Sequence, residues 1–121
     1  MNNSQIIDSE FFKLIECALK KIPGNQDIAE KFIYGNDEFK RYLVGKNEES
    51  FQIINKFSVD GIIDDYSETG QFWHQVPVVR SKEISKNSIV VNCSTAISPI
   101  SVKKNLLASG FKNIINFYEL Y

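Results

Sequence analysis

The chain has 121 residues, of which 43% are hydrophobic and 24% are charged, a composition typical of one globular domain and unlike that of disordered or membrane-embedded proteins. Fourteen Lys and Arg residues against fifteen Asp and Glu residues give a net charge of -1, which argues against a protein that binds nucleic acid. No apolar run approaches the roughly 20 residues of a transmembrane helix and no signal-cleavage pattern occurs, so we expect a cytoplasmic protein without membrane insertion.

The N-terminal part is expected to contain one amphipathic helix. Its apolar residues lie at helical spacing between positions 11 and 22, basic residues occupy the opposite face, and Pro23 ends the helix. A polar linker follows. We therefore interpret residues 1–30 as an N-terminal helix and linker, and residues 31–121 as the main part of one compact domain.

Short apolar segments rich in β-branched or aromatic residues alternate with helical patterns along the rest of the chain. The first expected strand covers residues 31–35 and leads through a glycine turn into an expected helix over residues 36–44. Further strands are expected at residues 59–65, 76–79, 88–93 and 113–118. A Ser-Pro helix start at positions 98 and 99 and the glycine at position 110 predict a helix between the last two strands.

This alternation of strands and helices predicts an α/β fold, because parallel neighbours in a sheet are joined by crossover helices. Right-handed crossovers with one reversal of direction give a Rossmann-like open parallel sheet of about five strands in the order 3-2-1-4-5, with an extra N-terminal amphipathic helix. In such a sheet a ligand binds beyond the carboxyl ends of the strands, where the order reverses. The residues after strands 1, 2 and 4 are therefore the candidate site.

Six residues follow those strands and are candidate contacts for a cofactor or ligand: Gly35, Asn36, Asp64, Asp65, Ser94 and Thr95. A first turn that binds a diphosphate needs three glycines, so that the backbone can approach the phosphates closely. Here the three positions hold Gly35, Asp37 and Lys40, which makes the glycine loop degenerate. The alternative is an ordinary turn capped by Asp37 that binds no ligand.

The carboxylates after strand 2 are better placed to contact a ligand. Asp64 or Asp65 can accept hydrogen bonds from ribose hydroxyls or from a base. Alternatively, the two acids cap the following loop and remain solvated. Ser94 and Thr95 can donate to a phosphate, or they can end strand 4 by bonding to their own backbone.

The chain offers no convincing set of catalytic or metal-binding residues. His74 is the sole histidine, which excludes a site made of several histidines, and we expect it in a loop. Cys17 and Cys93 lie far apart in the sequence among apolar residues, so we expect both thiols to be reduced and unpaired. The prediction is a domain with no catalytic residue and no metal.

Three motifs carry a resemblance to a known family: Ile-Asp-Asp at positions 63–65, Pro-Val-Val at positions 77–79 and Gly-Phe-Lys-Asn-Ile-Ile at positions 110–115. With them, residues 31–120 resemble the Rossmann-like, nucleotide-sugar-associated domain of surface-polysaccharide enzymes. That domain is the N-terminal domain of some FkbM-type methyltransferases and is similar to the N-terminal domain of left-handed β-helix sugar acyltransferases. The resemblance implies that Gly35, Asp64 and Asp65 frame a nucleotide or UDP-sugar, and that any methyltransferase or acyltransferase domain lies outside this polypeptide.

Three functions are open at this point. The first is a non-catalytic module that binds a nucleotide or nucleotide-sugar and serves as a domain of, or partner to, a methyltransferase-type enzyme of polysaccharide biosynthesis. The second is a ligand-free scaffold that forms a homo-oligomer or part of a larger enzyme. The third is a small NAD-dependent enzyme, which the missing glycines and the lack of an acid/base pair disfavour.

Overall fold

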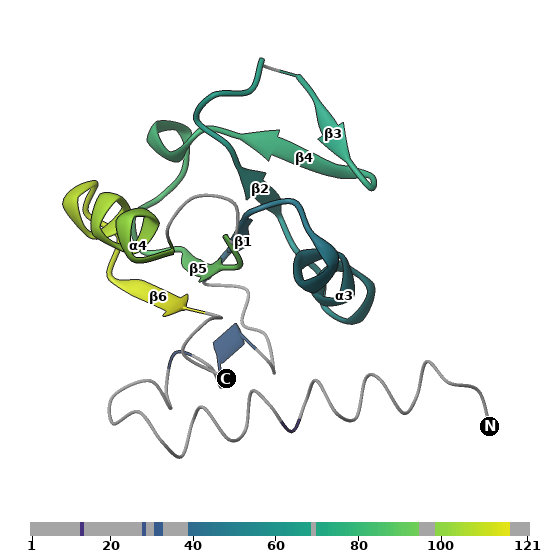
Figure 1. The fold of residues 1–121 in the computed structure, drawn as a ribbon, viewed down its shortest axis with the longest axis horizontal. Coiled ribbons are helices and arrows are strands. Elements are labelled where there is room, and N and C mark those ends of the chain that lie inside the picture. Colours follow the sequence, from purple (N-terminus) through teal and green to yellow (C-terminus); the bar gives the residue numbers. More distant parts are fainter. Residues whose placement is uncertain are drawn as a thin grey trace.

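A six-stranded sheet is the centre of the structure, a computed structural model that describes residues 13, 28, 31–32, 39–68, 70–94 and 99–116 (Figure 1). Its strands are β1 (Arg41–Val44), β2 (Gly61–Ile63), β3 (Phe72–Trp73), β4 (Val76–Val79), β5 (Ile89–Asn92) and β6 (Asn113–Asn116). Two α-helices, α3 (Glu48–Lys56) and α4 (Pro99–Ala108), and the short 3-10 helix η1 (Ser81–Glu83) connect them.

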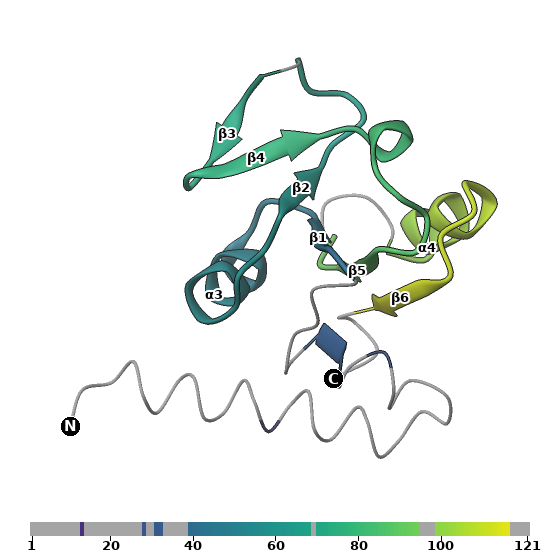
Figure 2. The ribbon, with the colours of Figure 1, turned by 180° about the vertical axis from the view of Figure 1, so that it is seen from behind.

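The strands are arranged in the order β3-β4-β2-β1-β5-β6. All neighbouring pairs are parallel except β3 and β4, which form an antiparallel hairpin. Helix α3 connects β1 to β2 and helix α4 connects β5 to β6, and the two helices lie on opposite sides of the sheet (Figure 1, Figure 2). The chain therefore winds outward in both directions from β1, and the direction changes between β1 and β5.

Each face of the sheet has its own apolar layer, because successive side chains of a strand point to opposite faces. On the α3 side, buried strand residues pack with Ile53 and Phe57 of the α3 segment. On the α4 side, they pack with Leu106 of α4 and with Phe111. The strand residues of the first layer include Leu43, Ile62, Val76, Ile89, Val91 and Ile115, and those of the second include Tyr42, Ile63, Val90 and Ile114.

The chain passes from β2 to its parallel neighbour β4 through β3, which forms a hairpin with β4, and not through a helix as between β1 and β2 or between β5 and β6. Its two-residue turn, His74 and Gln75, has positive φ at both positions (48° and 68°), the condition for the tight turns that suit a twisted hairpin. The His74 ring packs edge-on against Phe51 of α3 and against Trp73, with centroids 4.4 Å and 4.5 Å away. His74 is therefore a turn residue that fastens the hairpin to α3.

Two expected elements near the start of the domain are wrong. Residues 31–32 are helical, so the strand expected there is not formed at its start. Arg41–Val44, expected in a helix, is β1, with a parallel partner on each side. The pairing buries Tyr42 and Leu43 on opposite faces, and this gain overrides the weak helical pattern of so short a segment. Strand count and order also differ from those expected, because β3 extends the sheet at the edge.

Other expectations are confirmed. The sheet is mostly parallel in an α/β fold, and the strands expected at residues 59–65, 76–79 and 88–93 contain β2, β4 and β5. Helix α4 begins at the expected proline and is followed by Gly110 with φ of 100°. The expected N-terminal helix lies outside the described residues apart from Lys13, which is helical. None of the helices formed by the described residues has the length and apolar character that a membrane span requires.

Candidate functional site

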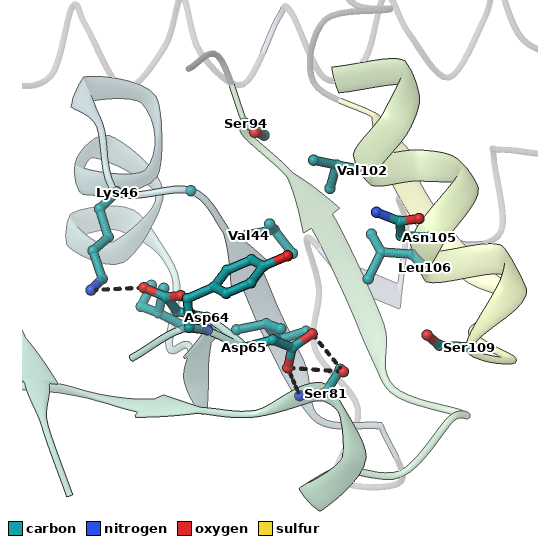
Figure 3. A pocket seen from close by; sticks show the side chains of 14 residues that line it. Val44, Lys46, Asp64, Asp65, Ser81, Ser94, Val102, Asn105, Leu106 and Ser109 are labelled. Atoms are coloured by element: carbon teal, nitrogen blue, oxygen red, sulfur yellow. Dashed lines mark hydrogen bonds and ion pairs between the residues drawn. The ribbon is translucent and has the colours of Figure 1, made fainter. Parts of the chain in front are cut away.

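A cavity of about 330 Å³ opens at the carboxyl ends of β1, β2 and β5, where the direction of winding changes (Figure 3). Its volume is in the range of small-molecule sites. Apolar residues of the sheet and of α4 form one part of the lining, among them Val44, Ile63, Val102 and Leu106. Polar side chains form the other part, among them Lys46, Asp64, Asp65, Ser81, Ser94 and Asn105. This is the location at which open α/β sheets bind their ligands.

Half of the six sequence-predicted site residues line this cavity. Asp64 and Asp65 follow β2, and Ser94 follows β5, so the structure brings these three together. The other three, Gly35, Asn36 and Thr95, lie outside the described residues. Lys40, expected in the first glycine turn, directly precedes β1. Lys40 therefore leads into β1, and the remainder of the expected glycine turn, residues 35–38, lies outside the described residues.

The turn after β1 begins at Gly45, which the sequence interpretation missed. Its φ is 102°, a backbone conformation that favours glycine. A Cβ added at Gly45 would lie 3.1 Å from the carbonyl carbon of Cys93 and from the Cα and N of Ser94. Any other residue would combine an unfavourable φ with a tight contact of its Cβ, so glycine suits this close passage of the turn by the segment after β5. A sign was present in the sequence, since Asn47 and Ser50 mark a helix start two residues after Gly45.

The N-terminus of α3, which follows that turn, is closed by its own residues. The Asn47 side chain accepts a hydrogen bond from the Ser50 backbone at 3.0 Å, and the Ser50 hydroxyl accepts one from the Asn47 backbone at 2.9 Å. Glu48 and Glu49 add two carboxylates to the first turn. These groups stabilise the positive end of the helix dipole and oppose a phosphate there. The turn thus lacks the phosphate-binding character of a glycine-rich loop.

Asp64 has three different residues as partners of its carboxylate. It accepts hydrogen bonds from the Ser67 hydroxyl at 2.6 Å and from the Tyr66 backbone N–H at 3.0 Å. The Lys46 ammonium group lies 3.3 Å from the same carboxylate, as Figure 3 shows. The hydrogen bond from Ser67 is the main cause that lowers the pKa of Asp64, and the Tyr66 and Lys46 interactions add to it against the opposing effect of burial.

Asp65 ties the loop after β2 to the segment after β4. Its carboxylate accepts hydrogen bonds from the backbone N–H of Ser81 at 2.7 Å and from the Ser81 hydroxyl at 2.9 Å. Nearby, the Arg80 guanidinium donates to the Ser67 carbonyl at 3.1 Å. One side of the cavity is therefore formed by the loop after β2, which hydrogen bonds hold at several points. Asp64 caps the loop after β2, as one of the two sequence interpretations expected for both acids, whereas Asp65 bonds to Ser81 after β4.

The free energy of unfolding is expected to decrease when the pH is lowered below about 4, and Asp64 is one cause of this decrease. Its folded-state pKa is lower than the unfolded value of about 4, so its contribution is fully present above that value and is lost as the pH falls through the folded pKa. Urea unfolding at pH 7 and pH 3 measures this loss. The variant Asp64→Asn should show a smaller loss than the native chain, whereas Glu68→Gln, an exposed position in the same loop, should show the native loss. Equal pH dependence in all three proteins would contradict the assignment.

Neither a metal cluster nor a reactive thiol occurs in the part of the chain that the structure describes. No group of three or more His, Cys, Asp or Glu residues there is arranged to hold a metal ion. Cys93 is free and buried, and burial, with a smaller effect of Glu49, raises the pKa of its thiol, which stays protonated at neutral pH. Cys17 lies outside the described residues.

No family model, curated protein or solved structure matches this chain with significance. The resemblance to the N-terminal domains of FkbM-type methyltransferases and β-helix acyltransferases therefore stays a prediction from the sequence. What the site can bind follows from its own geometry, which combines an apolar wall with a rim of one ammonium group, two carboxylates and several hydrogen-bonding side chains.

Proposed function

We propose that this domain binds a nucleotide or nucleotide-sugar in the cavity and does not itself catalyse a reaction. The observation that carries the proposal is the position of Asp64, directly after β2, in a cavity at the point where the winding direction changes. An acidic residue at this point of an open α/β sheet is suited to accept hydrogen bonds from ribose hydroxyls. The link to polysaccharide enzymes rests on the resemblance alone.

The ribose hydroxyls are expected to donate to Asp64. A carboxylate offers about four acceptor positions. Three of them at Asp64 are used by Tyr66, Ser67 and Lys46, which leaves room for a hydroxyl from the ligand. The apolar wall formed by the sheet and α4 provides the contact area for the remainder of the ligand.

The phosphates are expected on the side of Ser94 and α4. The first turn of α4 contains no acidic residue, in contrast to the first turn of α3 with Glu48 and Glu49. A phosphate is more favourable at a helix N-terminus without carboxylates. Because no glycine-rich loop surrounds the phosphates, we expect weaker binding than in dinucleotide enzymes.

Binding is tested first by a thermal-shift screen of the full chain with UDP-sugars, nucleoside phosphates, NAD and S-adenosylmethionine, because a ligand of the native state raises the melting temperature. The role of Asp64 is then tested by calorimetry with UMP and with 2′,3′-dideoxy-UMP, which has the same phosphate and base but no ribose hydroxyls. The native chain should prefer UMP by about tenfold, as expected for hydrogen bonds to a charged acceptor.

The variant Asp64→Asn should lose most of this preference. Removal of the Asp64 charge also changes how strongly Lys46 attracts a phosphate. UMP and 2′,3′-dideoxy-UMP carry the same phosphate, so this change cancels in the ratio of their affinities. Glu68→Gln removes the same charge from the same loop without touching the cavity lining, and it should keep the native preference. A native chain that binds none of the screened ligands would refute the proposal and favour the ligand-free scaffold, which the self-capped start of α3 already fits.

A further inference from the structure

Tyr66 is an aromatic residue placed at the cavity with its side chain in solvent. Four large apolar or aromatic side chains are strongly exposed among the described residues: Tyr66, Phe72, Ile100 and Leu107. Tyr66 is the most exposed of them at 93%, and it alone of the four belongs to the cavity lining. A ring in this position gains nothing for folding, so its apolar surface is available to a ligand.

The backbone that carries this ring is held on both sides. The Tyr66 N–H donates to Asp64 at 3.0 Å, and the Ser67 hydroxyl donates to the same carboxylate at 2.6 Å. The Ser67 carbonyl accepts from Arg80 at 3.1 Å, and Asp65 accepts from Ser81 at 2.7 Å. Fixing the ring on a ligand therefore requires the ordering of only the two side-chain torsions of a tyrosine, which keeps the entropic cost low.

We infer that Tyr66 stacks on the planar ring of the ligand, which for the proposed nucleotide is the base. The inference rests on the proposed function and adds a residue that contacts the base of the ligand. Tyr66 lies two positions after Asp64, the expected ribose contact, and the base of a nucleotide is bonded directly to its ribose. A ribose at Asp64 therefore brings the base within reach of the Tyr66 ring. Base stacking on an aromatic side chain tolerates any base, so discrimination between bases is not required of this residue.

The test compares UMP and AMP with ribose 5-phosphate, which retains the sugar and phosphate but has no base, by calorimetry on the full chain at fixed salt. The native chain should bind each nucleotide at least about tenfold more tightly than ribose 5-phosphate. Tyr66→Ala should weaken nucleotide binding by about tenfold and leave the affinity for ribose 5-phosphate unchanged. Tyr66→Phe retains the ring and should bind both nucleotides as the native chain does.

Phe72→Ala is the matched control, since it removes an exposed aromatic ring that is outside the cavity lining, and it should leave all affinities unchanged. The side chain of Tyr66 is almost fully exposed, so Tyr66→Ala should keep the native melting temperature. Nucleotide binding that Tyr66→Ala leaves unchanged would overturn the stacking inference while the proposed function stands. A native chain that binds neither UMP nor AMP nor any UDP-sugar would overturn both.

Discussion

Replacement of Leu43 by alanine is expected to lower the free energy of unfolding by about 3 kcal/mol, in the range found for leucine truncations in well-packed cores. Leu43 is fully buried in the middle of β1, and its backbone pairs with Ile62 of β2 and Val91 of β5. Strands on both sides and α3 above prevent the surroundings from collapsing into the space of the lost atoms. Urea denaturation monitored by Trp73 fluorescence measures the difference.

The control for this prediction is Leu107→Ala, which removes the same atoms from a side chain of α4 that is 51% exposed. Its cost should be below about 1 kcal/mol, because little apolar surface returns to water and alanine favours a helix. Similar losses for the two variants would contradict the placement of Leu43 at the centre of the sheet.

Three of the strands that the sequence identified correctly share one physical property. The segments Gly61–Ile63, Ile89–Asn92 and Asn113–Asn116 are short, nearly continuous apolar runs, the pattern of parallel strands covered on both faces. Local residue types are enough to recognise such strands. Helix α4 was equally visible, because its proline start and the glycine after its end are local features too.

The first strand was missed because its structure is decided by distant partners. Arg41–Val44 is four residues long and follows Phe39, and the spacing of Phe39 and Leu43 is the same as on a helix face. Only the pairing with β2 and β5, which lie far along the chain, makes it a strand. The two residues of β3 escaped notice for a similar reason, since their turn contains neither glycine nor asparagine.

The prediction of the site residues depended on the prediction of the strands that precede them. Asp64, Asp65 and Ser94 were located because the strands before them were identified, and the rule for open α/β sheets then places their side chains at one edge. Gly45, which begins the turn after β1, was missed because Arg41–Val44 was expected to be helical. The position of Tyr66 in solvent could not be predicted, since exposure of a loop residue depends on which elements fold over it.

Replacement of Gly45 by alanine is expected to lower the free energy of unfolding by about 2–5 kcal/mol, because two costs add. The first is the positive φ of 102°, which costs an L-residue about 1–2 kcal/mol. The second is the contact of the new Cβ with the backbone of Cys93 and Ser94 at 3.1 Å, and such overpacking typically costs about 1–3 kcal/mol.

The neighbouring backbone cannot easily move away to relieve this contact. The Cys93 N–H donates to the Val44 carbonyl at 2.8 Å, the Cys93 carbonyl accepts from the Asn47 side chain, and the Ser94 N–H donates to Asn92 at 3.1 Å. Gly70→Ala is the matched control, because Gly70 also has a positive φ (82°) but an added Cβ meets no atom within 4 Å. The difference between the two variants in urea denaturation therefore measures the close approach of the backbones alone.

The same pair of variants connects stability to the proposed binding. Gly45 and Ser94 both line the cavity, so a shift of these backbones away from the new Cβ changes the shape of the site at the carboxyl ends of β1 and β5. At a temperature where both variants are folded, Gly45→Ala should weaken UMP binding severalfold, whereas Gly70→Ala, outside the lining, should bind as the native chain does. Equal losses of stability for the two variants would contradict the close approach at Gly45, and unchanged UMP affinity in Gly45→Ala would show that the ligand does not depend on this edge of the sheet.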